Sequence, residues 1–173
     1  MSELFTLRDV LTEQLRDLYD AETQYHTMLP GLIETSQSED LGFVLMAIMR
    51  QTAENTTRLA WACEKLQAEP TGIVCKAMEG LIRESRDTTK NRGEPAAIDA
   101  ALIANAQRIA HYEIAGFGTA KAFACQINEP AVAEALDDLL AEAWLADRAL
   151  TRIATGGSSG PGVNEKASNG EDK

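Results

Sequence analysis

Two glutamates occupy positions where the surrounding pattern predicts apolar side chains. Glu22 lies between Leu18 and Tyr25 in one helical stripe, and Glu113 follows Ile109 by one turn in another. A buried carboxylate without a partner costs several kcal/mol, so such a group must be protonated, paired or bound to a metal. Carboxylates from facing helices are the ligands of di-iron and di-manganese sites in helical bundles. A metal site is therefore the first chemistry that these residues indicate.

Four further side chains with ligand chemistry lie near the same stripes. Two are histidines, one turn after the first glutamate and two residues before the second, and two are acidic residues beside the stripe of the last predicted helix. Carboxylate and imidazole groups suit iron, manganese and zinc. The candidate metal ligands are Glu22, His26, His111, Glu113, Glu142 and Asp147.

Other features argue against a complete metal site. Acidic bundle sites use a Glu-x-x-His pair on one helical face, and the sequence contains no such pair. The stripe of the second predicted helix offers no ligand, because it carries Ile48, Thr52 and Asn55. A lone histidine on a helix flank is commonly a hydrogen-bonded structural residue, so both interpretations stay open. The charged residues of the second helix, spaced by four, predict a surface ladder: Arg50, Glu54 and Arg58.

Other catalytic chemistry has little support in the sequence. There is no glycine-rich phosphate loop and no nucleophile elbow. The three cysteines, Cys63, Cys75 and Cys125, have no histidine within helical reach, so a thiol nucleophile would lack a base. We expect all three to be buried free thiols. An enzymatic role is therefore not favoured, although the residues do not exclude one.

The composition narrows the classes of partner. The formal net charge is −11, which repels the phosphate backbone of nucleic acids and the anionic surface of membranes. No stretch approaches the roughly 20 apolar residues of a membrane span. The N-terminus has no basic flank followed by an apolar run, so no signal peptide is predicted. We therefore expect a cytoplasmic protein without nucleic-acid or membrane partners.

Helical periodicity predicts the elements that would position these residues. Apolar residues recur at spacings of three and four in four long segments and one short one. The connection between the second and third long segments spans about 28 residues, far more than an antiparallel helical hairpin needs. One long crossover is the wiring of ferritin-like bundles. The predicted helices cover about 7–35, 38–67, 74–89, 96–127 and 130–155.

The fold prediction is accordingly all-α: a ferritin-like four-helix bundle over 1–155, with a long crossover that contains a short fifth helix. The remaining segment, 156–173, consists of Gly, Ser, Asn, Pro and charged residues with little else. Such a composition has almost nothing to bury, so we expect a disordered acidic, Gly- and Ser-containing tail.

Several unusual segments resemble those of a known family, the ferritin-like stress proteins of the YciE/YciF kind. The resemblance extends over roughly 5–155, and its most specific segments are 17–22, 75–82, 99–103 and 111–115. It implies a ferritin-like bundle, a homodimer, a link to bacterial stress responses, and a di-metal site of iron or manganese inside the bundle.

The sequence departs from the family pattern where ligands are expected. The family carries a histidine and acidic residues just before Thr52, and here 47–51 reads AIMRQ. Ala110 replaces a family glutamate, and Glu142 is what remains of a glutamate run in the last helix. The resemblance therefore implies an eroded metal centre. Its remnants would be Glu22 and Glu113, held by His26, His111 or Asn55.

Two functions follow from this sequence. The first is a metal-poor structural or interaction dimer, with an unidentified protein partner, that works through its surface. The second is a di-iron or di-manganese protein with oxidoreductase or iron-handling activity. The missing ligands favour the first, and the acidic core positions favour the second.

Overall fold

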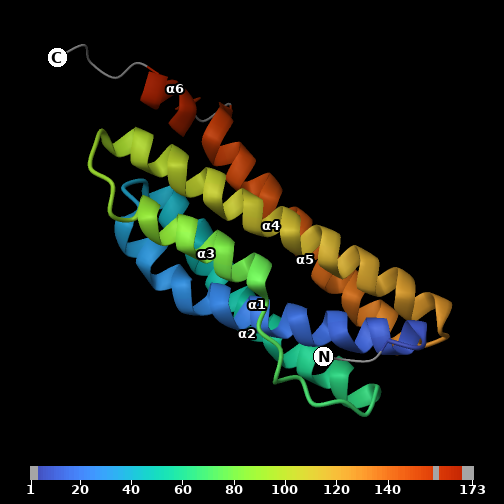
Figure 1. The fold of residues 1–173 in the computed structure, drawn as a ribbon. Helices are drawn as coiled ribbons and strands as arrows, with labels where there is room; N and C mark the ends of the chain where they lie inside the picture. The colour runs from blue at the N-terminus through green and yellow to red at the C-terminus, as the bar shows by residue number, and fades with distance from the viewer. Residues whose placement is uncertain (1–3, 158–159, 169–173) are drawn as a thin grey trace.

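A computed structural model of the chain describes residues 4–157 and 160–168, which form an elongated all-α structure (Figure 1). Four long helices and one short helix appear where helical periodicity predicts them, with ends within about three residues of the predicted ones. The helices of the bundle are α1 (Leu7–Thr35), α2 (Glu39–Lys65), α3 (Lys76–Thr88), α4 (Pro95–Gln126) and α5 (Pro130–Thr155).

Local sequence signals set where these helices begin. Thr6 and Asp9 form a capping box at the start of α1, and the Ser38 side chain accepts a hydrogen bond from the backbone N–H of Leu41 at the start of α2. Pro95 and Pro130 occupy the first positions of α4 and α5, where the missing N–H of proline leaves no hydrogen bond unmade.

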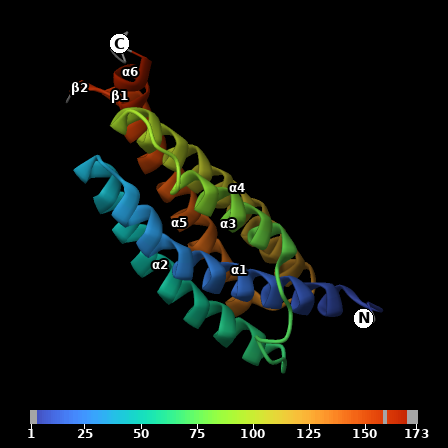
Figure 2. The ribbon, with the colours of Figure 1, turned by 60° about the vertical axis from the view of Figure 1, so that its left-hand side comes forward.

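The long helices pack as two antiparallel hairpins. The main packing partner of α1 is α2, and that of α4 is α5. The short helix α3 belongs to the crossover between the hairpins and packs on α1 and α4 (Figures 1 and 2). This is the predicted four-helix bundle with one long crossover and a short fifth helix.

The interior consists of two apolar clusters with a polar section between them. One cluster holds Leu11, Leu15, Leu18, Leu59 and Phe117, among others. The second holds a different set, which includes Tyr25, Leu29, Ile48, Ile109 and Leu150. Four of the buried polar residues, from α1, α2 and α4, fall where one cluster gives way to the other: Glu22, Thr52, Asn55 and Glu113.

The segment after α5 is more ordered than the sequence prediction. Gly156–Gly157 (β1) pairs antiparallel with Gly160–Pro161 (β2), and Val163–Ser168 forms a short helix, α6. Val163 is buried in the apolar cluster around Leu29, so the expectation that this segment has almost nothing to bury is wrong for the part described. The remaining tail residues, 158–159 and 169–173, lie outside the described residues.

Gly156 explains why a glycine-rich stretch suits this turn. Its φ of 73° lies in the left-handed region, and a Cβ there would approach the backbone N of Gly162 to 2.4 Å. Composition alone indicates disorder, whereas this turn uses glycine for close backbone contact. None of the described helices combines the length and the apolar character that a membrane span requires.

A buried aspartate joins the two hairpins near the loop between α1 and α2. The side chain of Asp99, in the first turns of α4, accepts hydrogen bonds from the backbone N–H groups of Gln37 and Ser38, each at 2.8 Å. Asp99 is 3% exposed, so water cannot easily replace these bonds.

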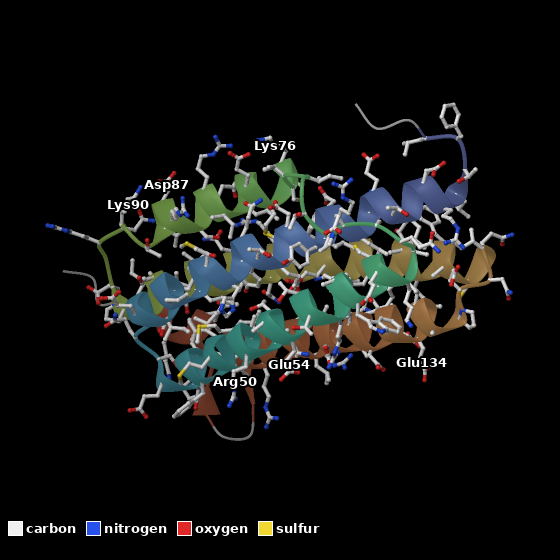
Figure 3. The ribbon with its side chains drawn as sticks, turned by 90° about the horizontal axis from the view of Figure 1, so that it is seen from below. Arg50, Glu54, Lys76, Asp87, Lys90 and Glu134 are labelled. Carbon is white, nitrogen blue, oxygen red and sulfur yellow. The ribbon has the colours of Figure 1, made fainter. Side chains whose placement is uncertain are left out.

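Replacing Asp99 by alanine should lower the free energy of unfolding by about 2 to 4 kcal/mol, because two backbone N–H groups lose the buried carboxyl group that accepts from them. Urea unfolding followed by circular dichroism measures this. The matched control is Asp87→Ala, since Asp87 forms an exposed ion pair with Lys90 and both side chains extend into solvent (Figure 3). Surface pairs contribute about 0 to 1 kcal/mol. Equal losses in the two variants would contradict the structural role given to Asp99.

Candidate functional site

The centre of the polar section is a pair of carboxyl groups. Glu22 of α1 and Glu113 of α4 hydrogen-bond to each other across the bundle, and their side chains are 0% and 6% exposed. Asn55 of α2 donates from Nδ2 to Oε2 of Glu22 at 3.1 Å. The two glutamates that sequence periodicity places in core stripes are therefore brought together by the fold.

Burial and mutual repulsion make this pair hold a proton. Burial is the main cause that raises the pKa of Glu22 from 4.5 to about 7. The pKa of Glu113 is raised well above 4.5, first by burial and then by the neighbouring Glu22. Two carboxylates this close cannot easily ionise together. The pair therefore titrates as a unit, with a shared proton between its oxygens near neutral pH.

Several polar atoms around the pair have no hydrogen-bond partner. They are Oε1 of Glu22, Oε1 of Glu113, Oδ1 of Asn55 and the hydroxyl of Tyr25. Burial, followed by the charges of Glu113 and Glu22, raises the pKa of Tyr25, so this hydroxyl keeps its proton. Three of the four atoms are acceptors, which makes the section a place where a donor or a cation would be stabilised.

The third acidic candidate, Glu142 of α5, lies at the edge of this section but is already paired. Arg58 of α2 donates from Nη1 to both carboxylate oxygens of Glu142, each at 2.9 Å. Arg50 and Glu54 extend outward, as the predicted ladder requires (Figure 3), and Arg58 also lies 3.7 Å from Glu54. The sequence does not predict the bond from Arg58 to Glu142, because the spacing of residues along one helix gives no information about contacts with a facing helix.

His26 is held by the backbone of α2. Its Nδ1 lies 3.0 Å from the carbonyl oxygen of Met49 and 3.0 Å from Oγ1 of Thr52. Since a carbonyl oxygen can only accept, Nδ1 carries the proton and donates. This nitrogen therefore serves as a structural donor between α1 and α2, which fits the hydrogen-bonded alternative.

His111 and Asp147 lie together away from the carboxyl pair. Nε2 of His111 is 3.4 Å from Oδ1 of Asp147, and the imidazole side chain is 59% exposed. The ring of Trp144 meets the imidazole edge-on, with centroids 6.0 Å apart, and Gln107 donates to Asp147 at 2.9 Å. The six candidates therefore do not converge: His111 and Asp147 form a surface contact between α4 and α5.

The donor set does not fit a di-metal centre. Within the described residues, no three side chains of the His, Cys, Asp and Glu types are grouped so that they could hold a metal ion together. Glu22 and Glu113 are bound to each other, Glu142 is neutralised by Arg58, and Asn55 turns its donor rather than its oxygen toward Glu22. We derive no chemistry through a metal from this arrangement.

A second polar network fastens the start of α3. The Tyr112 hydroxyl donates to Asp17 at 2.5 Å and lies 2.9 Å from Sγ of Cys75, whose backbone N–H donates to Asp20. Cys75 is buried, as expected, and burial raises its pKa. Cys63 is also buried, but Cys125 is exposed, so the expectation of three buried thiols is wrong for that residue.

Comparison with known proteins places these features in context. A family model described as a domain of unknown function, DUF892, matches residues 6–167, a range that includes α6. Protein YciF of Escherichia coli strain K12 is 33% identical over 165 residues, which cover 95% of this chain and 96% of YciF.

Solved structures show the same fold. YcfI of Rhodopseudomonas palustris, a proposed structural protein, superposes with a TM-score of 0.84 at 35% identity, over 88% of this chain and 97% of that one. The stress protein YciF of E. coli superposes with a TM-score of 0.84 at 32% identity, over 87% and 95%. A protein of Xanthomonas campestris, XCC3681, reaches 0.66 at 17% identity, over 85% and 91%, and shows the fold alone.

The carboxyl pair predicts how stability depends on pH. Because folding raises both pKa values, the folded state binds more protons than the unfolded state. The contribution of Glu22 is full below pH 4.5 and is lost as the pH rises through about 7, and that of Glu113 is likewise lost only as the pH rises through its own raised pKa. In Glu113→Gln the side chain at position 113 no longer titrates, so its pH-dependent contribution to the free energy of unfolding is lost. The variant should gain on the order of 1 to 3 kcal/mol relative to wild type between about pH 5 and 8.

Urea unfolding at several pH values measures the difference between the variant and wild type. Glu134→Gln is the matched control, because Glu134 lies exposed on α5 (Figure 3). A free-energy difference for Glu113→Gln that stays constant with pH would show that the pair does not hold a proton in the folded state.

Proposed function

This chain belongs to the DUF892 family, and from that premise we propose that it is a metal-poor relative of the stress protein YciF, acting as a structural or interaction protein. The observation that carries the proposal is that contacts within the chain already engage the acidic candidate ligands. Glu22 and Glu113 hydrogen-bond to each other, and Arg58 donates to both carboxylate oxygens of Glu142. A protein in which a shared proton and an arginine offset the charge of these groups can keep its fold without a metal.

The apolar character of neighbouring core positions supports the same proposal. Three buried residues near the polar section have no metal-binding atom in their side chains. They are Ile48 on α2, Ala110 on α4 and Ala143 on α5. Replacing ligands by Ile and Ala fills the interior with apolar atoms. The bundle is thereby stabilised by packing, which suits a protein whose role lies in its shape and surface.

Its surface offers apolar area for association. Phe43 and Met46, three residues apart on α2, are 62% and 37% exposed, and Leu145 on α5 is 58% exposed. Contiguous apolar patches on a protein surface commonly mark contact sites, and Phe43 and Met46 lie one turn apart on the same helix. We propose that the chain forms a homodimer and presents further surface to a protein partner. The R. palustris relative, a proposed structural protein, is consistent with a role of this type.

The second candidate function is a di-iron or di-manganese protein with oxidoreductase or iron-handling activity. One observation favours it: the Oε1 atoms of Glu22 and Glu113 have no hydrogen-bond partner, and free carboxylate oxygens attract cations. The remaining donors do not complete such a site, so we place it second.

Metal analysis separates the two candidates. Protein purified without chelator should contain well under one equivalent of iron or manganese, and added Fe²⁺ or Mn²⁺ should leave its thermal midpoint unchanged, because a ligand that binds the native state must stabilise it. Elemental analysis and scanning calorimetry measure both. One or two equivalents of metal, lost in Glu22→Ala and kept in Glu134→Gln, would instead establish the metal protein.

The homodimer is tested separately. Sedimentation equilibrium at micromolar concentration should give twice the 18.7 kDa mass of the chain. Phe43→Ser should weaken association by roughly tenfold if this exposed ring is in the interface, since about 1.4 kcal/mol corresponds to that factor. Thr57→Ser, an exposed change on the same helix, is the control. A wild-type chain that stays monomeric up to about 100 times that concentration would refute the dimer.

A further inference from the structure

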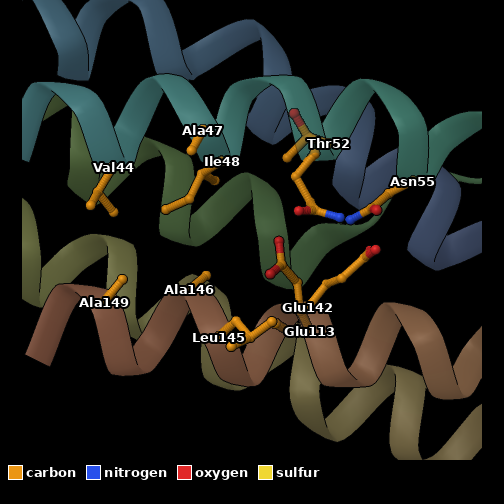
Figure 4. A pocket seen from close by; sticks show the side chains of 12 residues that line it. Val44, Ala47, Ile48, Thr52, Asn55, Glu113, Glu142, Leu145, Ala146 and Ala149 are labelled. Atoms are coloured by element: carbon orange, nitrogen blue, oxygen red, sulfur yellow. The ribbon is translucent and has the colours of Figure 1, made fainter.

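Two hollows in the surface of the bundle differ in the chemistry of their walls. The slot between α2 and α5 has a volume of ≈ 210 Å³, and most of its labelled residues are apolar (Figure 4). None of the described residues that line this slot is basic. A groove of ≈ 390 Å³ lies between α1 and α3, and three of its lining residues are cations: Arg83, Arg86 and Lys90. Of these two hollows, the groove therefore has the chemistry to hold an anion.

The segment that forms the α3 wall of this groove has a local excess of positive charge. Residues 76–92 have a net charge of +2, although the whole chain has a formal net charge of −11. The basic residues of the segment are Lys76, Arg83, Arg86, Lys90 and Arg92, and the acidic ones are Glu79, Glu84 and Asp87. An anion that is repelled by most of the surface would be attracted to this part of it.

The two carboxylates that line the groove already have lysine partners. Nζ of Lys76 lies 2.7 Å from Oε2 of Glu79, and Nζ of Lys90 lies 3.0 Å from Oδ1 of Asp87. Each of these pairs is neutral as a unit. The arginines of the groove therefore supply its net positive charge.

These two arginines can bind one phosphate group together. Arg83 and Arg86 lie three residues apart on α3, so they are neighbours on the helix surface. Both are exposed, and neither forms an ion pair with the carboxylates that the structure describes; the charge of Arg83 lowers the pKa of Glu79 less than Lys76 does. Guanidinium groups bind phosphate through two parallel hydrogen bonds. A phosphate monoester carries a charge of about −1.5 to −2 at neutral pH, which two arginines match.

The wall that α1 contributes offers acceptors. The hydroxyls of Thr23 and Thr27 each donate at 2.9 Å to the backbone carbonyl oxygen four residues earlier. Nε2 of Gln24 donates to Asp20 at 2.6 Å and to the carbonyl oxygen of Cys75 at 3.2 Å. Because these donors are in use, the hydroxyl and amide oxygens remain as acceptors. An occupant should therefore bring O–H groups to α1 as well as an anionic group to α3.

We propose that the groove between α1 and α3 binds a small sugar phosphate, with the phosphate group between Arg83 and Arg86 and the sugar hydroxyls against Thr23 and Thr27. Its volume of ≈ 390 Å³ lies within the range of about 300 to 1,000 Å³ that small-molecule sites occupy. This inference goes beyond the proposed structural role, and neither the metal content nor the oligomeric state of the protein decides it. An unphosphorylated sugar would lack the charge, and inorganic phosphate would lack the carbon-bound hydroxyls.

The test is a ¹H–¹⁵N NMR titration of the full chain with glucose 6-phosphate, glucose and inorganic phosphate. It is done at neutral pH and about 0.05 M salt, where exposed charges are only partly screened. Glucose 6-phosphate should shift the amide signals of 23–27 and 83–90 saturably, and it should bind at least about tenfold more tightly than glucose and about threefold more tightly than phosphate. Equal affinity for phosphate and glucose 6-phosphate would indicate an adventitious ion only and overturn the proposal, as would the absence of saturable shifts in these segments.

Two matched pairs of variants locate the binding. Arg86→Gln removes one guanidinium from the groove and should weaken glucose 6-phosphate binding about tenfold, whereas Arg50→Gln removes an outward-facing arginine of α2 (Figure 3) and should leave it unchanged. Thr27→Glu adds a carboxylate to the groove and should weaken binding similarly, whereas Thr57→Glu adds one at an exposed position of α2 and should not. Since the net charge changes equally within each pair, general attraction of anions cannot explain a difference. Equal affinities within either pair would refute the assignment.

Discussion

Two carboxyl groups buried against each other in a helical bundle must share a proton or attract a cation, and the interior of this protein is arranged around that constraint. Glu22 and Glu113 interrupt two apolar clusters at the same level of the bundle. Their hydrogen bond and the Asn55 amide compensate part of the lost hydration, and the shared proton removes most of the repulsion. The neighbouring side chains do not complete a metal site, because they have other partners. His26 bonds to the carbonyl oxygen of Met49, and Arg58 bonds to Glu142.

Helix positions could be predicted from the sequence because they depend on local signals. Apolar spacing, the Thr6 cap and the prolines at 95 and 130 fix where helices begin, and crossover length fixes the connectivity. The same periodicity put Glu22 and Glu113 in the core, and the fold confirms that placement. The prediction of disorder after α5 is wrong for the part described, because burial of Val163 depends on tertiary contacts that composition does not report.

Contacts between helices were harder to predict, because they depend on rotation and register. Arg58 belongs to a regular surface ladder by spacing, yet it turns toward Glu142 on a facing helix. His111 stands two residues from Glu113, which places it on a different side of α4, against Asp147. The sequence does not predict the Asp99 bonds to the start of α2, since an acidic residue near the beginning of a helix is ordinary.

The contacts in the interior support the proposal of a bundle that keeps its architecture without a metal. The most direct measurement of that account is ¹³C NMR of the glutamate side-chain carboxyl carbons in metal-free protein. One resonance that belongs to the Glu22–Glu113 pair should titrate near pH 7, and stoichiometric Mn²⁺ should leave it unbroadened. Titration of both carboxyls at their ordinary value near 4.5, or selective broadening of both by one equivalent of Mn²⁺, would contradict it.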